Sequence, residues 1–367
     1  MSTKTKRSFE GVATVVDTDV HLTESQADLM PYLEGPFAEL IENAGEKYGG
    51  FWGNWYPAAG YFSPMDTGRI EIDSAGDPHE LRDWEVEVLG VDRAVLNPTQ
   101  NLGLGYVHHD ELSAALAHAY NEYLLDTYLD DVSEFYGSAV VSPQKPYAAA
   151  EEIDDRADES KIVSIMFPTS GLHPPAGHSM YDPIYDAIER SGLPVCMHNG
   201  VSGLMASFPL QWRGFSRFME AHAFVNPAQH MVNVASIITH GVPERFPDLD
   251  FVIMEAGLGW IPYYIHRLDE EYSAARHDAP ELTQPPSAYF EDQFYFTSQP
   301  IEGTGDPNYV RNVIDAFGGQ EKLMFSSDYP HFDFDHSDAL LDIVRGGFED
   351  GTVENVFSRT ADRVFGF

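Results

Sequence analysis

Short apolar runs, rich in β-branched and aromatic residues, recur along the chain, and each ends at a polar or turn-forming residue. Because these runs are continuously apolar rather than alternating, they predict the strands of a parallel sheet that is buried on both faces. We expect eight strands: Ala13–His21, Asp92–Pro98, Tyr136–Pro143, Lys161–Thr169, Leu193–Asn199, Phe251–Glu255, Gln293–Ser298 and Lys322–Asp328.

Segments with helical patterning separate these runs. The clearest are Glu80–Leu89, Asp110–Asp130, Pro183–Ser191, Ala228–Thr239 and Asn308–Phe317. Eight strands that alternate with helices favour an α/β protein with a single closed (β/α)8 barrel, the TIM barrel, over an open doubly wound sheet. The first strand also ends in Asp-x-Asp-x-His instead of the glycine-rich turn of a dinucleotide-binding fold. We expect an N-terminal tail over residues 1–12 and the barrel over residues 13–367.

Two connections are expected to be long loops: Leu22–Gly76 after strand one and Gly200–Gln229 after strand five. Both follow the carboxyl ends of strands, where barrel enzymes carry their active sites. Trp55 in the first loop, and Arg213 and Arg217 in the second, are candidate substrate-binding residues, because arginine binds carboxylates through paired N–H donors. The alternative is that the loop aromatics pack against the barrel and the arginines pair with surface acids.

The sharpest local signal is Asp19-Val20-His21 at the end of the first predicted strand. Side chains two apart on a strand share a face, and a buried carboxylate beside an imidazole is costly unless it is paired or metal-bound. His198 and Asp328 end predicted strands five and eight, so two carboxylates and two imidazoles are expected at one rim. This mixed donor set suits zinc, manganese or ferrous iron. The alternative is a set of ordinary salt bridges and turn caps.

These features resemble the amidohydrolase superfamily, specifically amidohydrolase family 2 and its branch of aminocarboxymuconate semialdehyde, resorcylate and carboxyvanillate decarboxylases. The resemblance covers residues 14–365. Beyond Asp-x-His it rests on three stretches: GVPERFPDLDFVI at 241–253, GWIPYYIHRLD at 259–269 and SSDYPH at 326–331. It implies a barrel enzyme with metal-dependent chemistry at the carboxyl ends of its strands.

The resemblance also implies a role for each candidate ligand. Asp19 and His21 match the family's His-x-His or Glu-x-His, His198 matches its strand-five ligand, and Asp328 matches its strand-eight ligand. Binuclear relatives add a carbamylated lysine at the end of strand four, where this chain has FPT at 167–169. We therefore expect one divalent ion, with zinc as the first choice and manganese or iron as alternatives.

Glu255 marks a departure from the family pattern. Relatives end strand six in a run such as A-H-G-G, whereas this chain reads MEAG at 254–257. We expect Glu255 to be a catalytic acid/base or a fifth metal ligand, and His222 is the alternative catalytic residue. His331, three residues beyond Asp328, is expected to orient that ligand. The alternative for both histidines is an ordinary position in a solvated loop.

The sequence is compatible with three functions. The first is a decarboxylase-like lyase that acts on a small aromatic or unsaturated carboxylic acid, which is what the resemblance implies. The second is a metal-dependent hydrolase of an amide, lactone or ester, in which Glu255 would take a proton from water. The third is a non-catalytic, metal-stabilised binding protein.

The composition excludes some classes of partner. The 59 acidic and 21 basic residues give a formal net charge of −38, which disfavours nucleic acid and anionic membranes. So large an acidic excess, with only six lysines, predicts a protein from a high-salt cytoplasm. Cys196 is the single cysteine, and no apolar stretch resembles a signal or membrane span. We expect a cytoplasmic homo-oligomer, a dimer, with a small-molecule organic acid as its substrate.

Overall fold

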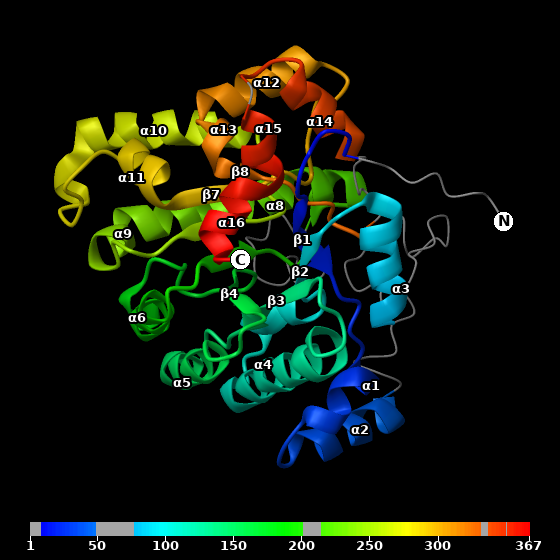
Figure 1. Ribbon diagram of the computed structural model, residues 1–367. Coiled ribbons are helices and arrows are strands. Elements are labelled where there is room, and N and C mark those ends of the chain that lie inside the picture. The colour runs from blue at the N-terminus through cyan, green and yellow to red at the C-terminus, as the bar shows by residue number, and fades with distance from the viewer. Residues whose placement is uncertain (1–8, 49–76, 201–213, 332–336, 350) are drawn as a thin grey trace.

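A barrel of eight parallel strands, in chain order, forms the centre of the protein (Figure 1). The computed structural model describes residues 9–48, 77–200, 214–331, 337–349 and 351–367. The strands are β1 (Val16–His21), β2 (Arg93–Asn97), β3 (Phe135–Val140), β4 (Ile162–Pro168), β5 (Val195–His198), β6 (Phe251–Ile253), β7 (Phe294–Thr297) and β8 (Leu323–Met324). Every predicted strand is present, and the predicted fold class is confirmed.

The backbone after β8 closes the barrel against β1. The Thr18 N–H donates to the Phe325 carbonyl at 3.1 Å, and the His21 N–H donates to the Tyr329 carbonyl at 2.7 Å. Between these two bonds, the Asp328 N–H donates to the Asp19 carbonyl at 3.0 Å. The two candidate carboxylate ligands are therefore neighbours across the closing seam, although 309 positions separate them in the sequence.

Helices surround the strands (Figure 1). They are α1 (Gln26–Leu29), α2 (Phe37–Tyr48), α3 (Pro78–Arg82), α4 (Asp110–Leu124), α5 (Pro146–Arg156), α6 (Asp182–Ser191), α8 (Phe218–Thr239), α9 (Val242–Arg245), α10 (Trp260–Ala275), α11 (Pro286–Gln293), α12 (Pro307–Ala316), α13 (Gly319–Lys322), α14 (Ser337–Arg345), α15 (Thr352–Glu354) and α16 (Thr360–Phe365). Short 3-10 or π-helical segments extend or connect them: η1 (Met30–Tyr32), η2 (Asp83–Leu89), η3 (Asn101–Tyr106), η4 (Leu125–Leu129), η5 (Ser179–Tyr181), η7 (Arg276–Asp278) and η8 (Asn355–Arg359).

The predicted start of α8 is wrong. The sequence pattern placed it at Ala228, directly after Pro227, but the helix begins at Phe218 and contains the proline in its interior. Glu220 caps this earlier start, since its carboxylate accepts the backbone N–H groups of Ser216 and Arg217 at 2.9 and 3.2 Å. The loop after β5 is therefore shorter than expected.

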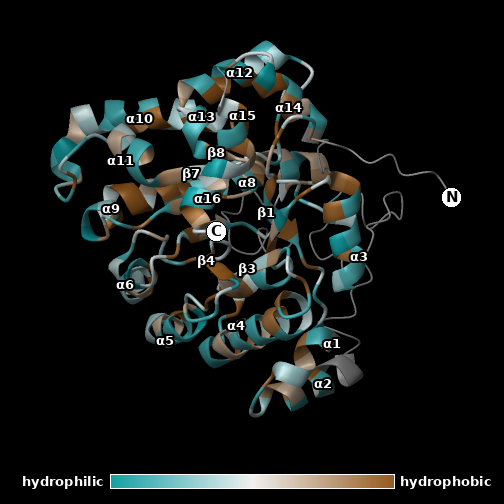
Figure 2. Ribbon diagram, viewed as in Figure 1, coloured by the Kyte–Doolittle hydropathy of each residue, from teal (hydrophilic) through white to brown (hydrophobic). Residues whose placement is uncertain are grey.

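Most of the buried side chains in the strands and in the layer between strands and helices are apolar. The side chains of β1, β4, β5, β6, β7 and β8 are all buried, and helices such as α6 bury one apolar side. In Figure 2 the strands are largely hydrophobic, whereas the helices have both hydrophobic and hydrophilic sides. Among the described residues, we find no helix with the length and apolar character needed to cross a membrane. The division into a tail and one domain remains a prediction.

Candidate metal centre

Strand β1 supplies the first two candidate ligands. Asp19 and His21 stand at alternate positions, and both side chains are fully buried. The His21 Nδ1–H donates to the Pro98 carbonyl at 2.9 Å, because a carbonyl oxygen only accepts. This bond leaves Nε2 of His21 with its lone pair 3.3 Å from Asp19 Oδ1 and 3.4 Å from Asp328 Oδ1.

His198, the last residue of β5, has the same orientation. Its Nδ1–H donates to the Asn199 carbonyl at 2.8 Å, which turns Nε2 toward the same point. The Nε2 atoms of His198 and His21 are 3.2 Å apart. His198 Nε2 also lies 3.5 Å from Asp19 Oδ2 and 3.4 Å from Glu255 Oε2. Two imidazole nitrogens and three carboxylates thus converge from β1, β5 and the segments that follow β6 and β8.

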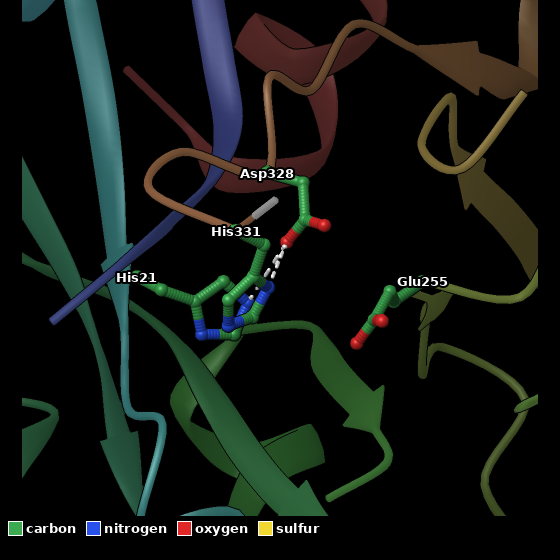
Figure 3. Close-up of side chains that lie close together, drawn as sticks. All are labelled: His21, Glu255, Asp328 and His331. Carbon is green, nitrogen blue, oxygen red and sulfur yellow. Dashed lines mark hydrogen bonds and ion pairs between the residues drawn. The ribbon is translucent and has the colours of Figure 1, made fainter. Parts of the chain in front are cut away.

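Asp328 and Glu255 both adopt left-handed backbone conformations. Their φ values are 60° and 47°, and they are the only non-glycine residues with positive φ in the described part of the chain. Such conformations cost free energy and concentrate at functional sites, where the surrounding structure holds them. Glu255 lies two residues beyond the end of β6. Figure 3 shows its carboxylate across the site from the rings of His21 and His331.

The local electrostatics favour positive charge between the carboxylates. Burial alone would raise the pKa of Asp19, but the neighbouring His198 and His21 hold it well below its usual value. Burial lowers the pKa of His198, yet Asp19, Glu255 and Asp328 outweigh that effect and raise it to about 9. Burial and the nearby His331 lower the pKa of His21 to about 4. The carboxylates therefore favour a positive charge at the centre of the cluster.

The donor set fits one divalent ion. Asp19 Oδ2 is buried and has no hydrogen-bond partner among the described residues. Donor atoms of Asp19, His21 and His198 lie within 4.8 Å of one another, as do donor atoms of His21, Glu255, Asp328 and His331. Nitrogen and oxygen ligands bind zinc at about 2.0 to 2.2 Å, so one ion could reach donors with these separations. The observation that best supports this fit is the approach of the two imidazole Nε2 atoms to 3.2 Å beside a buried carboxylate oxygen that accepts no hydrogen bond from the described residues.

The other predicted site residues have different surroundings. His331 Nδ1–H donates to Asp328 Oδ1 at 2.7 Å, and its ring lies 4.3 Å from that of His21. His222 is on α8, where its ring stacks on Phe218 at 4.8 Å. Arg217 is exposed at the start of α8. Arg213 and Trp55 lie outside the described residues.

Sequence reasoning missed two amides that contact the cluster. Asn97, at the end of β2, donates from Nδ2 to Asp19 Oδ1 at 2.9 Å, and it accepts from the Ser138 hydroxyl at 2.6 Å. Asn226 on α8 donates from Nδ2 to Glu255 Oε1 at 2.8 Å. The position of Asn97 at the end of an apolar strand was a usable signal. Asn226 offered none, because its segment was expected to be a loop.

The fold and these donors define a class: a (β/α)8 barrel with a candidate metal centre at the carboxyl ends of its strands. The chain belongs to the amidohydrolase family, whose model matches residues 16–367. The family expected from the sequence is confirmed. No curated protein sequence matches the chain.

Solved structures with the same fold include several decarboxylases. The 5-carboxyvanillate decarboxylase of Sphingomonas paucimobilis is 23% identical, with a TM-score of 0.73 over 96% of this chain and 99% of that one. The Novosphingobium aromaticivorans 5-carboxyvanillate decarboxylase, complexed with manganese and 4-hydroxy-3-methoxy-5-nitrobenzoic acid, is 19% identical, with a TM-score of 0.73 and full coverage of both chains. A dihydroxybenzoic acid decarboxylase from Polaromonas sp. JS666, with bound manganese and 2-nitroresorcinol, is 16% identical, with a TM-score of 0.65 over 96% and 97%.

Proposed function

We propose that this protein is a metal-dependent decarboxylase-like lyase that acts on a small aromatic or unsaturated carboxylic acid. The observation that carries the proposal is the convergence of His21 Nε2 and His198 Nε2, 3.2 Å apart, on the carboxylates of Asp19 and Asp328. Three solved structures with this fold are decarboxylases of 5-carboxyvanillate or dihydroxybenzoic acid, two of them with bound manganese. Family membership and the donor set support the same function.

In the proposed site, Asp19, His21, His198 and Asp328 hold one divalent ion. When bound, the ion would supply Lewis-acid attraction for the carboxylate and hydroxyl oxygens of the substrate. Pro98 and Asn199 fix the tautomers of the two histidines through their carbonyl groups. His331 holds the Asp328 carboxylate in place by donating to its Oδ1.

Decarboxylation replaces a carboxylate by a hydrogen atom. A proton is added to the carbon that bears the carboxylate, carbon dioxide leaves, and the electron pair of the broken C–C bond remains with the ring. Glu255 is the proposed proton carrier, because its Oε2 faces the cluster while Asn226 binds Oε1. His222, one helical turn before Asn226 on α8, remains the alternative.

The identity of the metal belongs to the proposal. Zinc was the first expectation, and manganese now stands beside it because two solved relatives hold manganese. Two imidazoles with two or three carboxylates suit either ion, so geometry favours neither.

Hydrolysis is the second candidate function, and Glu255 is the observation that favours it. A buried carboxylate beside the cluster can take a proton from water, as a hydrolase requires. The two functions differ in product, since only the lyase releases carbon dioxide.

The test is carbon dioxide release from a panel of hydroxybenzoic acids, with zinc-loaded and manganese-loaded protein. An amide, lactone and ester panel is run in parallel, and Asp328→Asn, which retains a similar shape, serves as the control. We expect carbon dioxide from at least one acid and a loss of about 10²-fold or more in Asp328→Asn. Turnover on the second panel alone would establish the hydrolase. No turnover on either panel at full metal occupancy would favour the binding protein.

A further inference from the structure

Helix α8 carries a buried polar side where it packs on the barrel. Barrel helices usually bury an apolar stripe. Here the buried residues include a polar set: Asn226, Gln229, His230, Asn233 and Ser236. Gln229 donates to the Thr169 carbonyl at 3.2 Å, and Asn233 accepts from the Ala176 N–H at 3.1 Å. Both of those contacts are made with the segment after β4.

Asn226 differs because its partner is Glu255. Nδ2 of Asn226 donates to Glu255 Oε1 at 2.8 Å, and both side chains are buried. The other carboxylate oxygen, Oε2, lies 3.4 Å from His198 Nε2. One oxygen of Glu255 is thus bound by α8 while the other faces the donor cluster. An amide N–H holds a carboxylate without exchanging its proton at ordinary pH, so this contact orients Glu255 without competing for the proton it carries.

The backbone of Asn226 is held by the residue that also orients His198. Asn199 Nδ2 donates to the Asn226 carbonyl at 3.0 Å, and the Thr169 hydroxyl donates to Asn199 Oδ1 at 2.9 Å. The Asn199 carbonyl accepts the Nδ1–H of His198 at 2.8 Å. The end of β5 therefore fixes both a candidate ligand and the turn of α8 that reaches Glu255.

We propose that Asn226 is a positioning residue for Glu255, acting through its hydrogen bond to Oε1. The left-handed backbone at Glu255 determines where its side chain begins, and the Asn226 amide determines which carboxylate oxygen faces the cluster. The inference rests on the proposed role of Glu255 and adds a residue that the sequence pattern did not predict. It also gives α8 a role in the chemistry besides covering the barrel.

The first test compares Asn226→Leu with Asn233→Leu. Both residues are buried asparagines on the same helix. Among the described residues, the Asn233 side chain bonds to backbone groups only, the N–H of Ala176 and the carbonyl of Gln229. We expect both variants to melt earlier and to keep the metal content of the wild type. Only Asn226→Leu should lose kcat, by about 10- to 100-fold, as expected for a lost hydrogen bond to a charged group. Equal kcat in the two variants would overturn the inference. Asn226→Ala and Asn233→Ala replace the pair if the leucine variants do not fold.

The second test is a double-mutant cycle with Glu255→Gln. If Asn226 acts only through Glu255, Asn226→Leu should cost nothing further in the Glu255→Gln background. Losses that multiply would overturn the positioning role while leaving the proposed function intact. If Glu255→Gln itself turned over like the wild type, the role proposed for Glu255 would fail, and the positioning role with it.

A crystal structure of each variant gives a readout that does not depend on turnover. We expect the Glu255 carboxylate to leave its place beside His198 in Asn226→Leu and to keep it in Asn233→Leu. An unmoved Glu255 in Asn226→Leu would contradict the inference.

Discussion

Glu255 is the candidate site residue whose role the sequence leaves most open. It lies two residues beyond β6, in a left-handed conformation, with a buried side chain between Asn226 and His198. A carboxylate in that place can carry a proton or bind a metal. The two roles predict different consequences for the same substitution.

Glu255→Gln keeps the size of the side chain and removes the proton carrier. If Glu255 is the acid/base, the rate should fall by about 10² to 10⁴ at unchanged metal content. If it is a fifth ligand, metal affinity should fall, and excess metal should restore much of the rate. Rate assays paired with metal analysis separate the two. Normal turnover and metal content with an earlier melting transition would remove Glu255 from the mechanism and shift attention to His222.

The residues of the candidate site were predictable to the extent that strands position them. Asp19, His21, His198 and Asp328 were found because polar residues at the ends of apolar strands meet at one rim of a barrel. The hydrogen bond from Asn226 to Glu255 was not predictable. The two residues are 29 positions apart, and they meet only because α8 packs beside the segment that follows β6. Contacts of this kind are set by tertiary packing rather than by local pattern.

At the scale of elements, the order of strands and helices was predictable and their ends were not. The apolar run that predicted Lys322–Asp328 as a strand contains only the short β8, after which the chain continues beside β1 through isolated bonds. Helix α8 starts earlier than expected because Glu220 caps it and the interior Pro227 does not end it. Local signals describe an element well, but its ends depend on which neighbours supply hydrogen bonds.

The segment that enters β6 carries a carboxyl group whose ionisation opposes folding. Burial raises the pKa of Asp250 from 3.8 to about 6, although Lys322 and Arg363 lower it. The folded protein therefore binds this proton more tightly than the unfolded chain does. Protonation stabilises the fold as pH falls through about 6, and that contribution is lost above it.

Asp250→Asn should accordingly raise the melting temperature most at pH 8 and by a smaller amount at pH 5, because the cost of ionising Asp250 in the fold grows as the pH rises from about 3.8 to about 6. The expected gain at pH 8 is about 1 kcal/mol, since partial exposure reduces the full value of the pKa shift. Asp248→Asn, at an exposed neighbouring residue, controls for the loss of one negative charge. A gain of the same size at both pH values, or in both variants, would contradict the burial argument.

The whole molecule is dominated by its charge of −38. Self-repulsion of that size destabilises a compact state, and salt screens it. Melting temperature and activity should rise between about 0.1 M and about 1 M salt, where the Debye length falls from about 10 Å to about 3 Å. Greatest stability in dilute buffer would contradict the prediction of a high-salt origin. The cytoplasmic location and the homodimer remain predictions from the sequence.

Elemental analysis of the purified protein tests most directly whether Asp19, His21, His198 and Asp328 hold one divalent ion. The wild-type chain, incubated with zinc or manganese and then desalted, should retain about one ion. His198→Ala and Asp328→Ala should each lose most of it while remaining folded by circular dichroism. Two ions per chain, none in the wild type, or an undiminished ion content in both variants would contradict the account.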